Sequence, residues 1–421
     1  MSSLKNNQPK LLSINNYHYR RGGSDAVYLD HDKMFSNNNW DTASFAMHHP
    51  KNLPSPWSKY FVDELEFGHA YNAYQKLIMA GKVVYSWEAR KKLNHLLDEF
   101  QPDIAHAHCI YHHISPSVLS LLHKKGIPTV MTAHDLKIAC PAYKMLNSQG
   151  ICEKCINGNV LHLAKNRCIH NSLSISSLIT IESAFHKFLG LYRNNLDSII
   201  VPSHFFREKL IQWGWPKDKL VYIPNFIDCS QITPNYEAGK YFLYIGRLAP
   251  EKGVDTLIKA AINANITLKI AGTGPYEKHL KATAEGHENI QFLGFKSGDD
   301  LWSLIHNTRA IVLPSEWYEN APISILEAFA AGKPVIGANI GGIPEMLQND
   351  VTGLTFKSAD IEDLTDKILK INTYSDDKVS ALGKNARDFV SSTFTAERYY
   401  TDMIKLYDSL GVNTKNLRKT L

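Results

Sequence analysis

The stretch AIVLPSEWYENAPISILEA, residues 310–328, shows how this chain is built. Its first four residues are apolar and predict a buried strand, which the following Pro-Ser pair ends. A helix pattern begins near Pro322, because proline suits the first helical position, where its missing N–H would have no partner anyway. A buried strand, a short loop and a helix form the repeating unit of α/β proteins.

Two carboxylates flank this predicted helix start, Glu319 in the loop and Glu327 inside the helix. Free amides at a helix N-terminus attract anions, so carboxylates beside them are expected to bind hydroxyl groups of the same ligand. Phosphate on the amides and hydroxyls on the carboxylates together describe a nucleotide-sugar. Either glutamate taken alone is equally well explained by the helix dipole or by an ordinary surface position.

Strand–loop–helix units recur along the whole chain. The protein has 421 residues, too many for one hydrophobic core, and fits two domains of roughly 200 residues each. The polar segment 229–240 predicts the linker between them. Strands are predicted at 10–16, 103–108, 128–132, 198–203 and 220–223 before the linker, and at 241–245, 266–271, 290–293, 310–313 and 334–338 after it. This alternation predicts the α/β class, with parallel sheets covered by helices on both faces.

Two positions in the first half are placed for contact with a ligand. Gly22-Gly23 follows the first predicted strand, and glycine lets the backbone come close to a ligand, although a tight turn without a ligand is the alternative. His134 follows the strand at 128–132, and ligands gather at the carboxyl ends of strands in open α/β sheets. A neutral imidazole there would hydrogen-bond a sugar hydroxyl, and a charged one would stabilise phosphate.

The second half opens with YFLYIGRLAPEKG, residues 241–253, which is again a strand and a loop. After Gly246, the guanidinium of Arg247 is suited to hold phosphate oxygens with two parallel N–H groups, and Lys252 adds a point charge. An Arg–Glu surface pair is the alternative. The turn that contains Gly274 has room for a flat base or a phosphate.

Four of the six cysteines lie within residues 140–168. The C-x-x-C spacing of Cys152 and Cys155 is typical of a metal knuckle, and Cys140 and Cys168 flank it. In a reducing compartment this pattern favours a structural zinc site over disulfides. His162 or His170 would be a substitute for one ligand. A redox-labile cluster and unliganded thiols remain as alternatives.

The net charge of +5 is uneven, because residues 1–200 contain 21 Lys and Arg against 15 Asp and Glu, which gives +6. This basic bias predicts peripheral contact of the first domain with an anionic membrane or a phosphate-bearing acceptor. A predicted amphipathic helix, 86–100, would place Trp87 on its apolar side and Arg90, Lys91 and Lys92 outside. A core-facing helix and a chance charge distribution are the alternatives.

Other partners and locations are not favoured. Basic clusters with interleaved aromatic residues are missing from the sequence, so no nucleic acid is expected. No apolar run approaches the ~18 residues of a membrane span, and residues 1–10 lack the apolar core of a signal peptide. We therefore expect a cytoplasmic protein. If the basic first domain contacts lipid, the protein would lie peripherally at the inner face of the membrane.

Taken together, these motifs resemble the retaining glycosyltransferases of family 4, the glycosyl transferases group 1, which have the GT-B architecture of two Rossmann-like domains facing a central cleft. The resemblance covers nearly the whole chain and is most specific over residues 241–357. The residues that carry it are the E-x7-E pair Glu319 and Glu327, Gly246-Arg247, Glu251-Lys252-Gly253, Gly22-Gly23, His134 and the segment from Gly341 to Glu345.

The resemblance implies a division of the chain. Residues 1–228, with the cysteine-rich insert 140–168, would form the acceptor-side domain, and 229–240 the linker. Residues 241–395 would form the nucleotide-sugar domain. In this architecture the last helix crosses back, so 396–421 would join the first domain.

The resemblance also implies residue roles. Arg247 and Lys252 would hold the donor diphosphate and stabilise the leaving group. Glu327 would bind the ribose hydroxyls, and Glu319 a hydroxyl of the transferred sugar. His134 would contact that sugar from the opposite domain. The remaining donor contacts would come from Gly22, Gly23, Gly246, Gly274 and the amides of Asn320 and Ala321.

The implied activity is transfer of a hexose-type residue from a UDP- or GDP-linked sugar to a glycan or lipid-linked acceptor, in the synthesis of surface polysaccharides or glycoconjugates. No catalytic metal is expected, because arginine, lysine and helix N-termini neutralise the diphosphate. Retention would come from front-face attack by the acceptor, whose proton passes to the departing phosphate oxygen. A nucleotide-sugar epimerase of the same shape and a non-catalytic nucleotide-sugar-binding protein are the competing interpretations.

Overall fold

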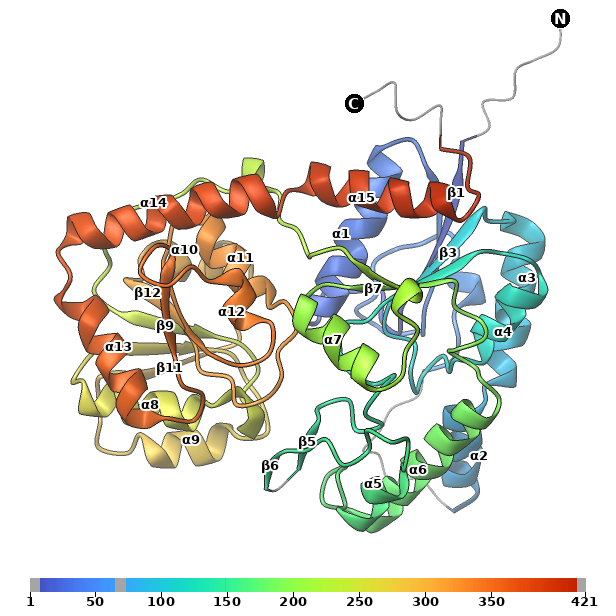
Figure 1. The fold of residues 1–421 in the computed structure, drawn as a ribbon, viewed down its shortest axis with the longest axis horizontal. Coiled ribbons are helices and arrows are strands. Elements are labelled where there is room, and N and C mark those ends of the chain that lie inside the picture. Colours follow the sequence, from blue (N-terminus) through green and yellow to red (C-terminus); the bar gives the residue numbers. More distant parts are fainter. Residues whose placement is uncertain (1–7, 65–72, 148, 415–421) are drawn as a thin grey trace, which may run out of the picture.

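The computed structural model describes residues 8–64, 73–147 and 149–414, which form two α/β domains (Figure 1). The first is built on a six-stranded parallel sheet of order β2-β1-β3-β4-β7-β8. Its strands are β1 (Lys10–Ile14), β2 (Asp41–Phe45), β3 (Ile104–Ala107), β4 (Thr129–Thr132), β7 (Ser198–Val201) and β8 (Leu220–Tyr222). Its helices are α1 (Gly23–Asn37), α2 (Ala73–Val84), α3 (Trp87–Phe100), α4 (Ser117–Lys124), α5 (Leu161–Lys165), α6 (Leu173–Phe188) and α7 (His204–Gln212).

The second domain has a six-stranded parallel sheet of order β11-β10-β9-β12-β13-β14, the order of a Rossmann fold. Its strands are β9 (Phe242–Ile245), β10 (Leu268–Ala271), β11 (Ile290–Gly294), β12 (Ala310–Leu313), β13 (Val335–Ala338) and β14 (Gly353–Phe356). Its helices are α8 (Val254–Asn263), α9 (Glu277–Thr283), α10 (Gly298–His306), α11 (Ile323–Ala330), α12 (Ile343–Met346), α13 (Ile361–Thr373) and α14 (Asp376–Thr393). The predicted α/β class with two Rossmann-like domains is confirmed.

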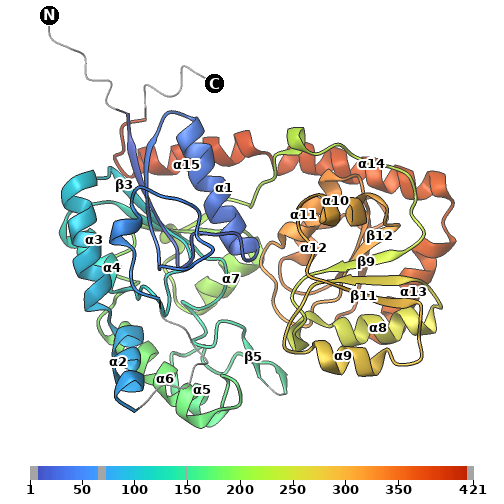
Figure 2. The ribbon, with the colours of Figure 1, turned by 180° about the vertical axis from the view of Figure 1, so that it is seen from behind.

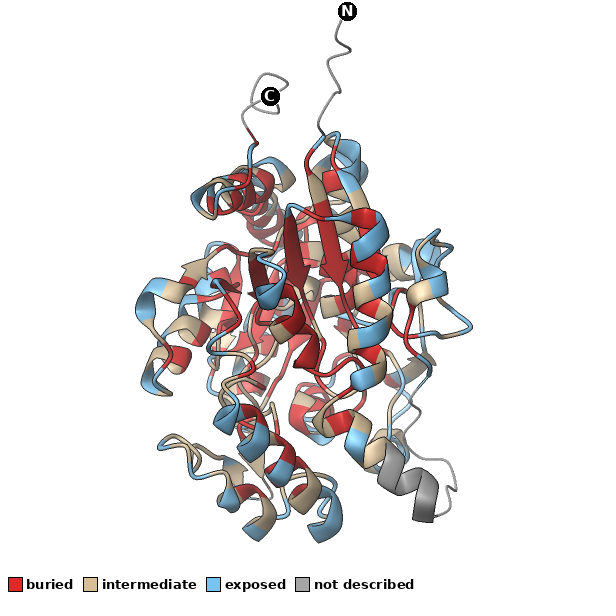
Figure 3. Cartoon of the chain, turned by 90° about the vertical axis from the view of Figure 1, so that its right-hand side faces the viewer, coloured by how far each residue is buried: buried red, intermediate tan, exposed pale blue. Residues whose placement is uncertain are grey.

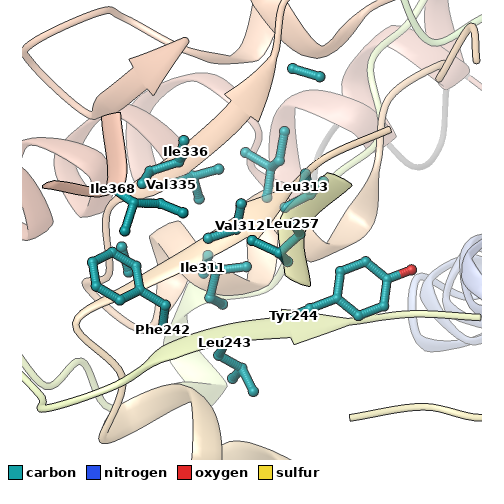
Figure 4. Packing of buried hydrophobic residues seen from close by; sticks show 14 of the residues in the cluster. Phe242, Leu243, Tyr244, Leu257, Ile311, Val312, Leu313, Val335, Ile336 and Ile368 are labelled. Atoms are coloured by element: carbon teal, nitrogen blue, oxygen red, sulfur yellow. The ribbon is translucent and has the colours of Figure 1, made fainter. Parts of the chain in front are cut away.

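The two sheets are buried on both faces, which explains why their strands are nearly continuous apolar runs. In the second domain, Phe242 and Leu243 of β9 pack beside Ile311 and Val312 of β12, and all four are at most 1% exposed (Figure 4). Figure 3 shows the same pattern from the side, with buried residues on the strands and exposed residues on the outer helix faces. The β9–β12 pairing brings the loops that follow these two strands together.

Helix α15 (Ala396–Ser409) leaves the second domain and packs on the first (Figures 1 and 2). Tyr399 and Tyr407 lie in one buried cluster with Leu11 and Ile104 of the first sheet. The chain passes between the two domains twice, once after β8 and once before α15. These two segments lie side by side, since the N–H of Ile227 donates to the carbonyl of Phe394 at 3.0 Å. The division at 229–240 stays a prediction that these contacts support.

The helix predicted at 86–100 differs from the prediction in one respect. Ser86 is its N-cap and accepts from the N–H of Ala89 at 3.1 Å. Trp87, expected on the apolar side, is instead 74% exposed, because Ala89 and Leu93 fill the core-facing positions of the first turns. The predicted apolar role of Trp87 is therefore wrong.

Candidate active site

The loop between β12 and α11 presents Glu319 beside Lys252. One carboxylate oxygen, Oε1, accepts from Lys252 Nζ at 2.6 Å, from Ser315 Oγ at 2.8 Å and from Trp317 Nε1 at 2.8 Å. Burial alone would raise the pKa of Glu319, but the ammonium and these hydrogen bonds outweigh it and hold the pKa below its usual value. Glu319 is therefore a fixed, ionised acceptor. Its other oxygen, Oε2, receives no hydrogen bond from the residues that the structure describes.

A close approach of two loops creates this pair. Gly253, just after Lys252, has φ = 66°, and a Cβ at that position would lie 1.9 Å from the carbonyl oxygen of Pro314. A side chain is thus excluded there by both conformation and space. The N–H of Glu316 also donates to the carbonyl of Glu251 at 2.9 Å. The loops after β9 and β12 are tied together, which sets Lys252 against Glu319.

Arg247 lies at the same edge of the sheet and is half exposed. Its Nη2 donates to Glu251 Oε1 at 2.5 Å, and Lys144 Nζ of the first domain approaches the same oxygen at 2.8 Å. Burial would raise the pKa of Glu251, but Lys144 and Arg247 outweigh it and lower the pKa. The Arg–Glu pair considered as the alternative is present, and it leaves much of the guanidinium accessible.

The amides predicted to contact the donor are unoccupied by protein groups. Among the described residues, the N–H groups of Asn320 and Ala321 have no hydrogen-bond acceptor. The Gly22-Gly23 turn at the start of α1 faces α11, because a Cβ at Gly23 would lie 3.6 Å from Ile323 Cγ1. A Cβ at Gly22 would meet nothing within 4 Å. The N-terminus of α1 thus faces that of α11 across the domain interface, and the free amides of Asn320 and Ala321 lie just before α11.

Glu327 stands on α11, which begins at Ile323 with Pro322 as its N-cap, one residue later than predicted. Burial raises the pKa of Glu327 to about 7, while Arg20 of the first domain opposes that rise and Asp30 adds to it. The side chain keeps some solvent exposure, and no described residue hydrogen-bonds its carboxyl group. An unpartnered carboxyl group at the interface is suited to a ligand that supplies hydroxyl donors.

His134 follows β4 at the end of the first sheet. Its Nε2 lies 2.9 Å from His108 Nδ1, and burial lowers the pKa of His134 to about 4. The imidazole is therefore neutral at pH 7, the state in which it was predicted to hydrogen-bond a sugar hydroxyl. Asn320 Nδ2 donates to the carbonyl of Ala133 at 2.8 Å, so the second domain touches the backbone beside His134.

A buried histidine group lies behind His134 and was missed in the sequence interpretation. Potential ligand atoms of His31, His106 and His108 all lie within 4.8 Å of one another. The hydroxyl of Tyr407 on α15 bonds His106 Nδ1 at 2.7 Å and His31 Nε2 at 3.3 Å. The H-x-H spacing of His106 and His108, which places both side chains on one face of a strand, was the available signal. This group supports His134 from inside the domain.

The domains are already in contact around the site. Asn320 Oδ1 accepts from Ser203 Oγ at 2.7 Å, and Ser203 also caps α7. Glu345 accepts from the N–H groups of His204 and Phe205 at 2.8 and 2.5 Å, which places a carboxylate at the N-terminus of α7. These bonds join the helix starts of one domain to the helix starts of the other.

Two glycines that were predicted to contact the donor, Gly246 and Gly274, lie where packing leaves no room for a side chain. A Cβ at Gly274 would lie 2.2 Å from the carbonyl oxygen of Leu248, and one at Gly246 would lie 2.8 Å from the hydroxyl oxygen of Tyr244. The room for a base or phosphate predicted at the Gly274 turn is thus filled, at the Cβ position, by neighbouring backbone. Donor contact at these positions would have to come from the main chain.

The four insert cysteines, Cys140, Cys152, Cys155 and Cys168, line one enclosed cavity together with His162 and Asn166. All are free thiols, and the structure forms no disulfide among them. Burial, with the other cysteines close by, raises the pKa of Cys140 to about 11 and that of Cys155 to about 12. The structure therefore gathers the residues of the predicted cluster around one point.

Two facing Rossmann-like domains, each built on a six-stranded parallel sheet, define the GT-B class. Comparison with known families agrees. The family described as Glycosyl transferases group 1 matches residues 227–389, and Glycosyltransferase Family 4 matches residues 61–231. The two matches together span residues 61–389. The chain belongs to the family 4, group 1 glycosyltransferases.

Curated relatives agree with this membership. An uncharacterized glycosyltransferase of Methanocaldococcus jannaschii is 28% identical over 255 residues, which cover 58% of this chain and 71% of that protein. The putative colanic acid biosynthesis glycosyltransferase WcaL of Escherichia coli is 22% identical over 259 residues, 58% of this chain and 64% of that protein. Both relatives are named as transferases, which favours transfer over the epimerase alternative.

Solved structures share the fold. Sucrose-phosphate synthase of Thermosynechococcus elongatus superposes with a TM-score of 0.70 at 19% identity, covering 96% of this chain and 99% of that one. HepE of Anabaena, in complex with UDP and glucose, gives a TM-score of 0.65 at 16% identity, covering 96% and 100%. At such identities the likeness establishes the GT-B fold alone. No described helix is long and apolar enough to span a bilayer.

Proposed function

We propose that this protein is a retaining, metal-independent hexosyltransferase that takes its sugar from a nucleotide diphosphate. The observation that carries the proposal is the group formed by Arg247, Lys252, Glu319 and the unpartnered Glu327, beside the free amides of Asn320 and Ala321. It offers positive charge and N–H groups for phosphate beside carboxylates for hydroxyls, within one domain interface.

The diphosphate would lie between the helix starts of α1 and α11. Free amides of Asn320 and Ala321 and the half-exposed guanidinium of Arg247 are suited to its oxygens. Lys252 adds the second positive charge. Because negative charge grows on the diphosphate as the glycosidic bond breaks, these groups stabilise the transition state more than the bound donor. They supply the charge that a metal ion would otherwise supply.

The hydroxyl groups of the sugar and of the ribose would hydrogen-bond the two carboxylates. Glu319 has its Oε1 saturated by three donors and its Oε2 open, so one oxygen is held by the protein and the other faces a sugar hydroxyl. Glu327 would accept from the ribose hydroxyls. The neutral His134 would hydrogen-bond the sugar from the first domain. None of the three needs to act as a nucleophile if the acceptor attacks from the front face.

We propose a glycan or lipid-linked acceptor, with peripheral membrane contact through α6 and not through the predicted Arg90–Lys92 face. Lys92 is paired with Glu88 and Asp63, and Arg90 donates to the carbonyl of Ser117, so that basic cluster is largely engaged. The exposed large apolar side chains of the surface around α6 include Trp87, Leu161, Leu173, Ile175, Ile181, Phe185 and Phe188.

The geometry of this surface supports a bilayer as its occupant. Ile181, Phe185 and Phe188 are spaced i, i+4 and i+7, so they share one face of α6. Tyr85 contacts both Trp87 and Phe185, which makes the apolar surface continuous with the start of α3. Residues 1–200 as a whole carry a charge excess of +6, which would attract this domain to an anionic surface. Flotation with anionic vesicles is expected for the wild type and reduced for Phe185→Ser/Phe188→Ser; equal flotation would contradict the assignment.

Incubation with a panel of UDP- and GDP-linked hexoses tests the activity. Thermal stabilisation identifies the nucleotide, and NMR of the released or transferred sugar reports the anomeric configuration. A retained configuration and full activity without added Mg²⁺ or Mn²⁺ are expected. An inverted product, or a donor isomerised without any acceptor, would refute the proposal. Arg247→Ala, which keeps the fold but removes the phosphate contact, is the matched control.

A further inference from the structure

The cysteine-rich insert, residues 140–168, reaches from the first domain to the donor site of the second. In Figures 1 and 2 its hairpin, β5 (Leu146–Asn147) and β6 (Gly150–Ile151), extends from the first domain toward the second domain. Two charged residues beside this hairpin, Lys144 and Glu153, contact the second domain directly. The insert thus connects the four-cysteine cavity with the residues proposed to bind the donor.

The first connection is the ion pair of Lys144 with Glu251. Lys144 Nζ lies 2.8 Å from Glu251 Oε1, the same oxygen that accepts from Arg247 Nη2. Glu251 is 4% exposed, so its carboxylate is held in place by these two cations. Lys144 therefore shares with Arg247 the single carboxylate that orients the guanidinium.

The second connection runs through Glu153, which stands between Cys152 and Cys155. Its Oε1 accepts from the hydroxyl of Tyr318 at 2.8 Å and from Lys209 Nζ at 2.6 Å. Tyr318 immediately precedes Glu319. The insert therefore holds the loop of the proposed sugar-binding carboxylate from the side of the first domain.

Four cysteine side chains line the cavity at the base of the hairpin, and their sulfur atoms lie farther apart than zinc coordination requires. Among the described residues, only the three buried histidines have ligand atoms all within 4.8 Å of one another, so no three of these sulfurs meet that spacing. A tetrahedral zinc site with Zn–S bonds of about 2.3 Å requires sulfur–sulfur distances of about 3.8 Å. Zinc would draw the insert inward by closing the cavity that the four cysteines line.

We propose that Cys140, Cys152, Cys155 and Cys168 bind one zinc ion, and that the metal fixes the insert as a clasp on the donor site through Lys144 and Glu153. The coupling to donor binding rests on the proposed function, whereas the metal site and the hold on the Tyr318 loop do not. Both connections form while the four sulfur atoms are still too far apart for a metal. The metal would therefore act by holding the base of the hairpin in place, and its removal would make both connections break more often.

Metal content tests the site. Full-length protein purified without chelator and analysed by mass spectrometry is expected to contain about one zinc per chain. Cys152→Ser/Cys155→Ser should lose the metal, and Cys229→Ser, a cysteine outside the insert, should retain it. Less than about a tenth of an equivalent in the wild type after zinc reconstitution overturns the site, as does full zinc content in the double variant.

Hydrogen exchange tests the clasp without any donor. Removal of zinc by a strong chelator is expected to speed exchange in residues 250–253 and 315–321, and zinc addition should reverse it. Lys144→Ala and Glu153→Gln should reproduce the faster exchange in the zinc-loaded protein and add little once zinc is removed. Unchanged exchange in both segments on zinc removal overturns the clasp.

Donor binding then tests the coupling, with UDP and GDP as the probes. The nucleotide that binds is expected to lose roughly five- to tenfold in affinity on zinc removal and by a similar factor in Lys144→Ala. Equal affinity with and without zinc overturns the coupling. If neither nucleotide binds, the proposed function fails, while metal content and hydrogen exchange still decide the zinc clasp.

Discussion

Replacing Lys252 with methionine removes the charge partner of Glu319 and keeps a side chain of similar length. Breaking a fully buried ion pair costs about 3–5 kcal/mol. Here the lysine and glutamate side chains are 22% and 11% exposed, and Glu319 retains Ser315 and Trp317 as donors. We therefore expect a loss of about 2 kcal/mol, which lowers the Tm of a domain of this size by roughly 4–8 °C.

The loss should depend on pH. With the ammonium removed, burial raises the pKa of Glu319, so the carboxyl group takes up a proton at mildly acidic pH and the stability deficit shrinks. In Lys252→Met/Glu319→Gln the orphaned charge is gone, and stability should return close to that of the wild type. Activity should not return in either variant, because the positive charge proposed for the diphosphate is missing; a fall of about 100-fold or more in kcat is expected.

Thermal unfolding at pH 7.5 and pH 5.5, with turnover of the identified donor, measures both effects. A Lys252→Met protein as stable as the wild type at pH 7.5 would show that the ion pair does not hold the loop. Restored stability together with restored activity in the double variant would refute the phosphate role of Lys252.

Arg247→Ala should lower kcat/KM about 100-fold or more with little change in Tm, measured by steady-state kinetics; near-normal turnover would rule out phosphate contact. Because the pKa of Glu327 is about 7, affinity for the nucleotide diphosphate should rise about tenfold from pH 6 to pH 8 by calorimetry, and Glu327→Gln should flatten that dependence. Asn320→Ala removes bonds to Ser203 and to the carbonyl of Ala133, so donor KM should rise roughly five- to 30-fold and the free protein should open, as read by X-ray scattering. His134 has a folded pKa of about 4 against 6.5 when unfolded, so it contributes a stability loss of about 2 kcal/mol between pH 7.5 and pH 5, and a His134→Asn protein should lose less over that range in urea unfolding.

Much of the fold could be predicted because both sheets are parallel and covered on both faces. Their strands, such as β9 and β12, are apolar along their whole length and are separated by polar turns, which is a strong local signal. Strand order was not readable in the same way. Strands β9 and β12 are neighbours in the sheet although 64 residues, 246–309, separate them in the chain, and this pairing places Lys252 against Glu319.

The sequence allowed the site residues to be predicted from their types, but not the residues that contact and hold them. Glu319, Glu327, Arg247 and Lys252 carry chemistry that their local pattern indicates. The support around them has no such pattern, since Lys144 and Glu153 come from an insert whose only visible signal was its cysteines. Trp87 was misplaced because amphipathic periodicity is least informative at the first turn of a helix, where a side chain can project past the core.

Helix α15 has a consequence for the order in which the chain acquires its structure. It comes from the far end of the sequence, yet Tyr399 and Tyr407 complete a cluster with Leu11 and Trp40 from its beginning. During synthesis the first domain emerges from the ribosome with one sheet face only partly covered, by residues such as Phe35 and Trp40, and the second domain can finish its own core first. The half of the protein made first is therefore the half that matures last, and its apolar face must be kept from aggregating until the final helix arrives.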